Sequence, residues 1–285
     1  MATTGRNRSE GWTHAKVDGH VNEVEFGKEL FSDPVMISEI IAVSGINAPK
    51  ESPTVRVDGN KHVTSIFGDS TVSKVDLQLH WSSGEYINIS LKKSDAGQVW
   101  LISVPRFFST VEHHLGRSLD SDVKSGISLF IGGKNLSDCM SLYEAALEAD
   151  TKNIPKIANQ EIHQKRLVAL SIKDHYPDIW NATIDFFNSN IELITSLSFS
   201  MGLAKSKEDS AQVVVYNNAS AGANVFNIHE IVAFAHESVI VTPIDSGPMN
   251  GGSTLLLPTG FLQMHHPQGD NQLQFHHQYK KISSL

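Results

Sequence analysis

The chain of 285 residues contains a single cysteine, Cys139, so a zinc site built from several cysteines is excluded within one chain. It also lacks any apolar run of about 18 residues, the length that a membrane-spanning helix requires. Its opening residues, MATTGR, do not have the character of a signal peptide. We therefore expect a soluble, cytoplasmic protein that makes no membrane contact.

Positive charge is also scarce. The chain has 23 Lys and Arg against 31 Asp and Glu, for a formal net charge of −8 at pH 7. Non-specific affinity for nucleic acid comes from an excess of basic residues, so this balance argues against indiscriminate DNA binding. A local basic groove remains compatible with it, because Lys and Arg are enriched in the N-terminal half. The length is sufficient for one large domain or two small ones.

Two segments, residues 74–81 and 85–92, alternate apolar and polar side chains with the period of a half-buried strand. Their apolar positions are Val75, Leu77, Leu79, Trp81, Ile87, Ile89 and Leu91. Ser82-Ser83-Gly84 between them is composed of turn-forming residues. The pattern predicts a β-hairpin with one apolar and one polar face.

The polar face of this hairpin carries residues that can take part in catalysis or bind a metal. If both apolar sets share one core, Asp76 is expected opposite Lys92, with Ser90 one step along the same face. An acid and a lysine side by side form a compact candidate site. The plainer alternative is a surface salt bridge, which would contribute little to stability.

Asp76, followed after a short hairpin by Ser90-Leu91-Lys92, resembles the core motif of the PD-(D/E)XK nucleases. Residues 73–76 and 89–94, with Gln98 downstream, resemble type II restriction endonucleases in particular. The resemblance implies that Asp76 holds a divalent metal and that Lys92 orients the attacking water and the scissile phosphate. The chain departs from the family pattern where Ser90 replaces the usual acid. It departs again just before Asp76, where the usual proline is absent.

A second acidic ligand is expected elsewhere, because a serine hydroxyl is a weak metal ligand. Residues 19–31 read as a short amphipathic helix, and restriction-type nucleases often place a glutamate of their first helix beside the metal. On that resemblance Glu23 is the expected ligand, and Glu25 is the reserve. Asp69 is a further candidate, although its Phe-Gly-Asp-Ser setting is typical of a turn. The alternative is that these acids are merely solvated.

The chemistry of phosphodiester hydrolysis favours Mg²⁺ as the cofactor. The reaction gathers negative charge on the phosphoryl oxygens, which a hard cation held by carboxylates stabilises. Mg²⁺ uses few protein carboxylates and keeps several waters. The expected site therefore consists of Asp76, Ser90, Lys92 and Glu23, with Asp76 and Glu23 as the metal ligands.

Other segments predict further elements. Strands are expected at residues 55–57, 62–66, 212–217, 239–244, 260–266 and 273–279. Helices are expected at residues 98–115, 136–149, 160–173, 178–197 and 226–236. The Asp58-Gly59-Asn60-Lys61 turn predicts that the first two strands form a hairpin. The last two carry adjacent histidine pairs, and their Gln and His side chains could contact phosphates or base edges more readily than a metal.

Together these observations lead us to expect a mixed α/β fold, with a restriction-endonuclease-like central sheet flanked by helices. We expect one nuclease domain over residues 1–285, with a catalytic core at about 19–115, a helical insertion at about 136–200 and C-terminal strands at about 211–285. The resemblance implies Mg²⁺-dependent, sequence-specific cleavage of double-stranded DNA by a homodimer, with a cognate DNA methyltransferase in the cell. Two alternatives stay open: a non-catalytic DNA-binding protein on a decayed nuclease fold, and a nuclease acting on branched or damaged DNA.

Overall fold

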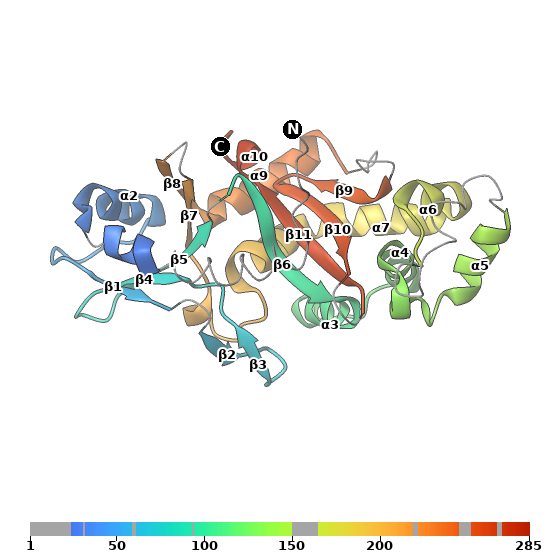
Figure 1. Cartoon of the computed structure of the whole chain (residues 1–285), viewed down its shortest axis with the longest axis horizontal. Coiled ribbons are helices and arrows are strands. Elements are labelled where there is room, and N and C mark those ends of the chain that lie inside the picture. Colours follow the sequence, from blue (N-terminus) through green and yellow to red (C-terminus); the bar gives the residue numbers. More distant parts are fainter. Residues whose placement is uncertain are drawn as a thin grey trace, which may run out of the picture. The chain divides into compact units, whose positions relative to one another are not determined.

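The computed structural model describes residues 24–30, 32–58, 61–92, 94–149, 165–218, 222–244, 252–266 and 270–285. The chain forms two compact units (Figure 1). The first combines Met1–Lys93 with Phe199–His229, and the second combines Ser94–Ser198 with Glu230–Leu285. That the whole chain acts as one nuclease domain stays a prediction.

The first unit is built on a five-stranded sheet with the order β1-β4-β5-β7-β8. Its strands are β1 (Thr54–Val57), β4 (Leu77–His80), β5 (Tyr86–Lys92), β7 (Val213–Asn218) and β8 (Gly222–Asn227). The central pair, β5 and β7, is parallel, and the other neighbours are antiparallel. The sheet is therefore mixed, and the expected mixed α/β class is confirmed. Two short strands, β2 (His62–Thr64) and β3 (Ser70–Val72), form a separate antiparallel pair.

One face of this sheet is covered by helices and holds the core of the unit. Six of the seven apolar side chains of the predicted hairpin lie in it, as the alternation predicted, and the seventh, Val75, is buried outside this cluster. Its buried members are Phe26, Leu30, Ile40, Leu77, Leu79, Trp81, Ile87, Ile89, Leu91, Val213 and Val215. Phe26 and Leu30 come from a helical segment at residues 24–30, and Ile40 comes from helix α2 (Pro34–Ser44).

Helix α2 is delimited by local chemistry at both ends. Asp33 precedes it, and its Oδ1 accepts hydrogen bonds from the backbone N–H groups of Val35 (2.9 Å) and Met36 (3.1 Å). Pro34 occupies the first turn, where its missing N–H costs no helical hydrogen bond. Gly45 ends the helix with a left-handed φ of 71°.

The second unit contains an antiparallel four-stranded sheet with the order β6-β11-β10-β9. Its strands are β6 (Ala96–Ser103), β9 (Thr254–Leu257), β10 (Gly260–His265) and β11 (Gln272–Gln278). Helix α3 covers one face, where the ring of Phe107 lies 5.9 Å from those of Trp100 and Phe275. The helices of this unit are α3 (Val104–Leu115), α4 (Ser121–Ile131), η1 (Gly133–Leu136), α5 (Met140–Ala149), α6 (Ala169–His175), α7 (Pro177–Ser189), α8 (Ile191–Ser196) and α10 (Tyr279–Ile282).

The described ranges contain three further helical segments. The 3-10 turn η5 (Lys207–Asp209) belongs to the first unit, whereas η4 (Leu197–Met201) and α9 (Ile228–Val241) cross the boundaries between units. In the ranges that the structure describes, no helix is long and apolar enough to cross a bilayer.

Several predicted elements differ from the observed ones because distant partners outweigh local pattern. Residues 98–103 were expected to be helical but belong to strand β6, which pairs with β11 far along the chain. Pro105 lies in the first turn of α3, where proline is tolerated. Residues 239–241 were expected in a strand but end helix α9. Its residues Ile231, Ala235 and Val239 are buried at helical spacing.

Other corrections concern pairing and helix limits. The hairpin expected between residues 55–57 and 62–66 is wrong, since β1 pairs with β4 and β2 pairs with β3. The helix expected at residues 178–197 is broken at Asn190 into α7 and α8. Of the helix expected at 160–173, residues 160–164 lie outside the described ranges, and α6 begins only at Ala169. The strands expected at 212–217, 260–266 and 273–279 are confirmed as β7, β10 and β11.

Candidate active site

The polar face of strands β4 and β5 carries the candidate site, and the described protein partly encloses it. Strand β5 lies between β4 and β7, so its polar residues Asn88 and Ser90 are buried, at 0% and 1% exposure. The alternation had predicted a face open to solvent. The difference arises because β7 and the segment that precedes it cover this face. Both are distant in sequence from β5, so the local pattern does not predict their contact with it.

The register of the hairpin differs by two residues from the predicted one. Leu77 pairs with Ile89 and Leu79 with Ile87, so Asp76, next in line, faces Ser90 and not Lys92. The cause is the turn. The Trp81 N–H donates to the Glu85 carbonyl (2.9 Å), which closes a three-residue turn with Gly84 at φ 104°. The shift is even, so each residue keeps its predicted face.

Asp76 lies at the entry to β4 and is held by both its backbone and its side chain. Its N–H donates to the Ile89 carbonyl (2.9 Å), which continues the ladder. Its Oδ2 accepts hydrogen bonds from the Leu91 N–H (2.6 Å) and the Ser90 Oγ (3.3 Å). Both side-chain contacts within the described ranges fall on Oδ2. Oδ1 is therefore the oxygen that could bind a cation.

Ser90 connects the acid to the lysine. The Lys92 Nζ donates to the Ser90 Oγ at 2.9 Å, and this hydroxyl in turn donates to Asp76. Lys92 is half-buried at the end of β5. The structure thus brings together the three predicted residues Asp76, Ser90 and Lys92 through one buried hydroxyl.

A second lysine, Lys74, belongs to the same cluster and was not assigned a role from the sequence. Its pKa is lowered to about 7, mainly by burial and also by the positive charge of Lys92, whereas the charge of Asp76 acts in the opposite direction. Its methylene stem runs past Gly202, where an added Cβ would lie 3.1 Å from the Lys74 Cε. The available signal was its alternation with Asp76, since residues two apart in an extended segment share a face.

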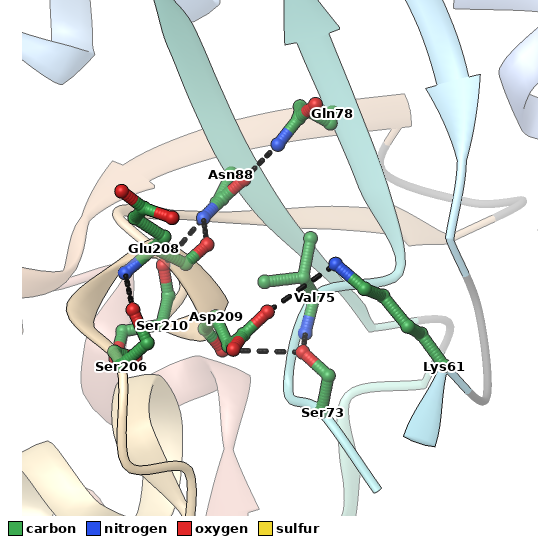
Figure 2. Close-up of polar contacts among 9 residues, drawn as sticks. All are labelled: Lys61, Ser73, Val75, Gln78, Asn88, Ser206, Glu208, Asp209 and Ser210. Atoms are coloured by element: carbon green, nitrogen blue, oxygen red, sulfur yellow. Dashed lines mark hydrogen bonds and ion pairs between the residues drawn. The ribbon is translucent and has the colours of Figure 1, made fainter. Parts of the chain in front are cut away.

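A hydrogen-bonded network beside the site fixes the segments that carry these residues (Figure 2). Asn88 Nδ2 donates to the carbonyls of Glu208 (2.7 Å) and Ser210 (2.9 Å), and its Oδ1 accepts from Gln78 Nε2 (2.8 Å). This buried amide therefore anchors the η5 turn on the polar face of the sheet. Asn88 is one of the polar residues of the alternating segment 85–92, and the sequence did not indicate this role.

The same η5 turn holds the chain just before Asp76. The Ser73 Oγ donates to the Asp209 carbonyl (3.1 Å) and accepts from the Val75 N–H (3.0 Å), as Figure 2 shows. The Asp209 carboxylate pairs with Lys61 at 3.2 Å. Residues 73–76 consequently have a fixed path, which is required if Lys74 and Asp76 are to keep their positions.

The described residues do not identify the second carboxylate ligand of the expected metal site. Glu23 lies outside the described ranges, and its role as a ligand stays a prediction. Glu25 is exposed on a helical segment whose Phe26 and Leu30 pack on the apolar face of the sheet. Asp69 lies in the turn between β2 and β3, where its carboxylate accepts from the Ser65 hydroxyl. Across the described ranges, no group of three or more His, Cys, Asp or Glu side chains is arranged to hold a metal.

The site offers the smallest number of protein ligands with which Mg²⁺ is commonly bound. Proteins commonly bind Mg²⁺ through one or two carboxylates, with waters and substrate phosphate oxygens completing the shell. Asp76 supplies one carboxylate, and the Ser90 hydroxyl lies beside it. The positive charge of Lys92, and that of Lys74 when it is protonated, oppose a cation, so a phosphate or a further carboxylate would strengthen its binding.

No family model and no curated protein matches the chain. Among solved structures, the chain is similar to the restriction endonuclease MspI, crystallised in complex with its cognate DNA. That alignment covers 87% of this chain and 81% of the MspI chain, with a TM-score of 0.43 and 11% sequence identity. Similarity at this level identifies neither a family nor an activity, and the function must be argued from the geometry of the site.

Proposed function

We propose that this protein is a Mg²⁺-dependent endonuclease that hydrolyses phosphodiester bonds of double-stranded DNA at a specific sequence, as type II restriction endonucleases do. The observation that carries the proposal is the convergence of Asp76 and Lys92 on the Ser90 hydroxyl. A fixed carboxylate next to a fixed ammonium provides a position for a cation and a positive charge for the attacked phosphate.

Each residue has a distinct task in this proposal. Asp76 is oriented by the Leu91 N–H and the Ser90 hydroxyl, so Oδ1 could hold the metal. Mg²⁺, when bound, would stabilise the developing phosphoryl charge and lower the pKa of its water. Lys92 binds a phosphate oxygen or orients the attacking water. Ser90 fixes the position of Lys92 and is at most a weak or water-mediated metal contact.

The second carboxylate is proposed to be Glu23. Glu23→Gln should raise the Mg²⁺ concentration required for half-maximal cleavage, and added metal should restore part of the rate. If the metal titration of Glu23→Gln matches that of the wild type, Glu23 is not the ligand, and Glu25 and Asp69 become the next candidates.

A homodimer and a cognate DNA methyltransferase are part of the same proposal. Cutting both strands at one position requires two active sites, which two copies of the chain would supply. A methyltransferase that modifies the same sequence would protect the DNA of the host cell.

The proposal is tested by incubating the purified protein with unmethylated phage DNA and Mg²⁺ and mapping the fragment ends. Discrete fragments with a common end sequence are expected, and Asp76→Ala should produce none. The second candidate function is non-catalytic DNA binding on a decayed nuclease fold, which Ser90 at the position of the usual acid favours. Binding without cleavage at any divalent metal concentration would select that candidate. If the protein cleaves only branched or damaged DNA, the proposed restriction activity is wrong, and the protein is a nuclease specific for such structures.

A further inference from the structure

Within the described ranges, the hydrophobic core of the second unit lies against one face of its four-stranded sheet. Trp100, Phe275 and Leu262 lie on the buried face, under helices α3 and α4. The strands β6, β11 and β10 are neighbours in this sheet (Figure 1). Their opposite face carries mainly uncharged polar side chains. We call this surface the Gln/His face, and it includes Gln98, Phe261, Gln263, Gln274 and His276, together with Leu101, which pairs with Gln274.

Hydrogen bonds run across the Gln/His face in one direction. The Gln263 Nε2 donates to the Gln274 Oε1 (2.8 Å), and the Gln274 Nε2 donates to the Gln98 Oε1 (2.9 Å). The Gln263 Nε2 also lies 3.1 Å from the His276 Nε2. Each amide is therefore held in one orientation, so its nitrogen and its oxygen occupy fixed positions toward a ligand.

The network leaves hydrogen-bonding capacity available. A glutamine amide has two N–H donors and two acceptor lone pairs. Gln274 uses one donor toward Gln98 and one acceptor toward Gln263, so one of each remains. That pair is the set with which glutamine binds an adenine through N6 and N7. Because the side chain is already ordered, little rotamer entropy would be lost on binding.

The charge of the surface agrees with a nucleic-acid partner. None of the four strands contains Asp, Glu, Lys or Arg, although the whole chain carries 31 acidic residues and a net charge of −8. An acidic face would repel the phosphates that flank a groove, and a strongly basic one would bind them without reading sequence. A neutral face with fixed donors and acceptors suits base edges.

Two rings add an apolar contact to the same face. Phe261 and His276 stack with their ring centroids 4.5 Å apart and their planes at 8°. Burial lowers the pKa of His276, and the neighbouring His265 lowers it further, so both favour the neutral imidazole. A neutral imidazole both donates and accepts, and an aromatic edge can contact the thymine methyl group.

We infer that the Gln/His face reads base edges in a groove of double-stranded DNA, with Gln263 and Gln274 as specificity-determining residues. The inference rests on the proposed function, because it names the surface that selects the cleaved sequence. A β-sheet surface can enter a DNA groove in this way, and the major groove presents a distinct donor and acceptor pattern for each base pair.

The test separates sequence preference from both cleavage and general affinity. A library of random-sequence DNA duplexes is selected on the wild-type protein with Ca²⁺ in place of Mg²⁺, and the bound pool is sequenced. The same selection is made with Gln274→Ala and with the double variant Gln263→Ala, Gln274→Ala. Asn181→Ala, which removes an exposed amide from helix α7, is the matched control. Thermal unfolding checks each variant, and Gln98→Ala is the alternative if Gln274→Ala folds poorly.

The wild type should enrich one motif. In the glutamine variants the preference at particular positions of that motif should fall about tenfold or more, while affinity for unselected duplexes stays unchanged. Asn181→Ala should enrich the wild-type motif. If the glutamine variants enrich the same motif as the wild type, the Gln/His face does not read bases, whereas the proposed function stands. If the wild type enriches no motif and cleaves no DNA with Mg²⁺, the proposed function fails, and the inference fails with it.

Discussion

Replacing Lys92 by methionine gives the sharpest test of the proposed active site. Methionine keeps an unbranched stem of similar length and removes only the charge and the donors. The single hydrogen bond that is lost, from Nζ to the Ser90 Oγ, contributes about 1 kcal/mol to stability. The half-buried Lys92 side chain lies at a strand end, so its loss should leave the fold intact.

The expected loss of cleavage is much larger than the loss of stability. A unit charge about 4 Å from a phosphate, at an effective dielectric constant of about 20, interacts by about 4 kcal/mol. Part of this interaction is already present in the bound substrate, and only the part that grows in the transition state accelerates the reaction. The comparable loss of one electrostatic stabiliser in other enzymes costs about 100-fold or more. Lys92→Met should therefore lower the cleavage rate by at least about 100-fold.

The assay is single-turnover cleavage with enzyme in excess over a DNA duplex, alongside binding measured in Ca²⁺. Lys50→Met is the control, since Lys50 is an exposed lysine of the same unit and has no proposed role. The cleavage rate of Lys92→Met should fall while its DNA affinity changes little. Normal cleavage from preformed Lys92→Met complexes would refute the assignment, and an equal loss of binding and cleavage would reduce Lys92 to a binding residue.

Three further predictions concern the residues around Lys92. Asp76→Ala should abolish cleavage and leave much of the DNA binding, and Asp76→Ala protein that cleaves at the wild-type rate would remove the metal ligand from the proposal. Ser90→Ala should slow single-turnover cleavage less than Lys92→Met does, because the hydroxyl positions the lysine and binds metal weakly at best; a larger effect would make Ser90 a direct ligand. Lys74 should make stability rise with pH. Its folded pKa of about 7 lies below the unfolded value of about 10.4, so between these values the unfolded chain binds the extra proton. Urea unfolding in metal-free buffer should show the wild type gaining stability relative to Lys74→Met between pH 7 and 9, by at most about 1 kcal/mol per pH unit. A pH-independent difference between the two proteins would contradict the burial of the ammonium.

The hairpin at the site could be predicted because its determinants are local. Alternation assigned Asp76, Ser90 and Lys92 to one face and the apolar residues to the other. Both assignments are confirmed except for Val75, which is buried outside the core cluster. The register was wrong by two residues because it depends on how the turn closes. The turn is closed by a hydrogen bond between the backbone groups of Trp81 and Glu85. Backbone groups are the same in every residue, so residue type constrains this choice only weakly.

Elements whose partners are distant in sequence could not be read from local pattern. Residues 98–103 were expected to form one helix with residues 104–115, and only their pairing with β11 fixes them as strand β6. Conversely, Val239 to Val241 favour a strand by residue type. They are helical because Ile231, Ala235 and Val239 form one buried stripe. In both cases the free energy of tertiary packing exceeds that of local propensity.

By itself the sequence determined which side chains can perform chemistry and which face of the hairpin carries them, because the two-residue period of a strand is a local property. Only the tertiary structure decided that the Ser90 hydroxyl joins Asp76 to Lys92. It alone brought the η5 turn over Asn88 and desolvated Lys74. Burial and hydrogen bonding depend on segments more than 100 residues apart in the chain, such as β5 and β7, whose contact no local pattern encodes.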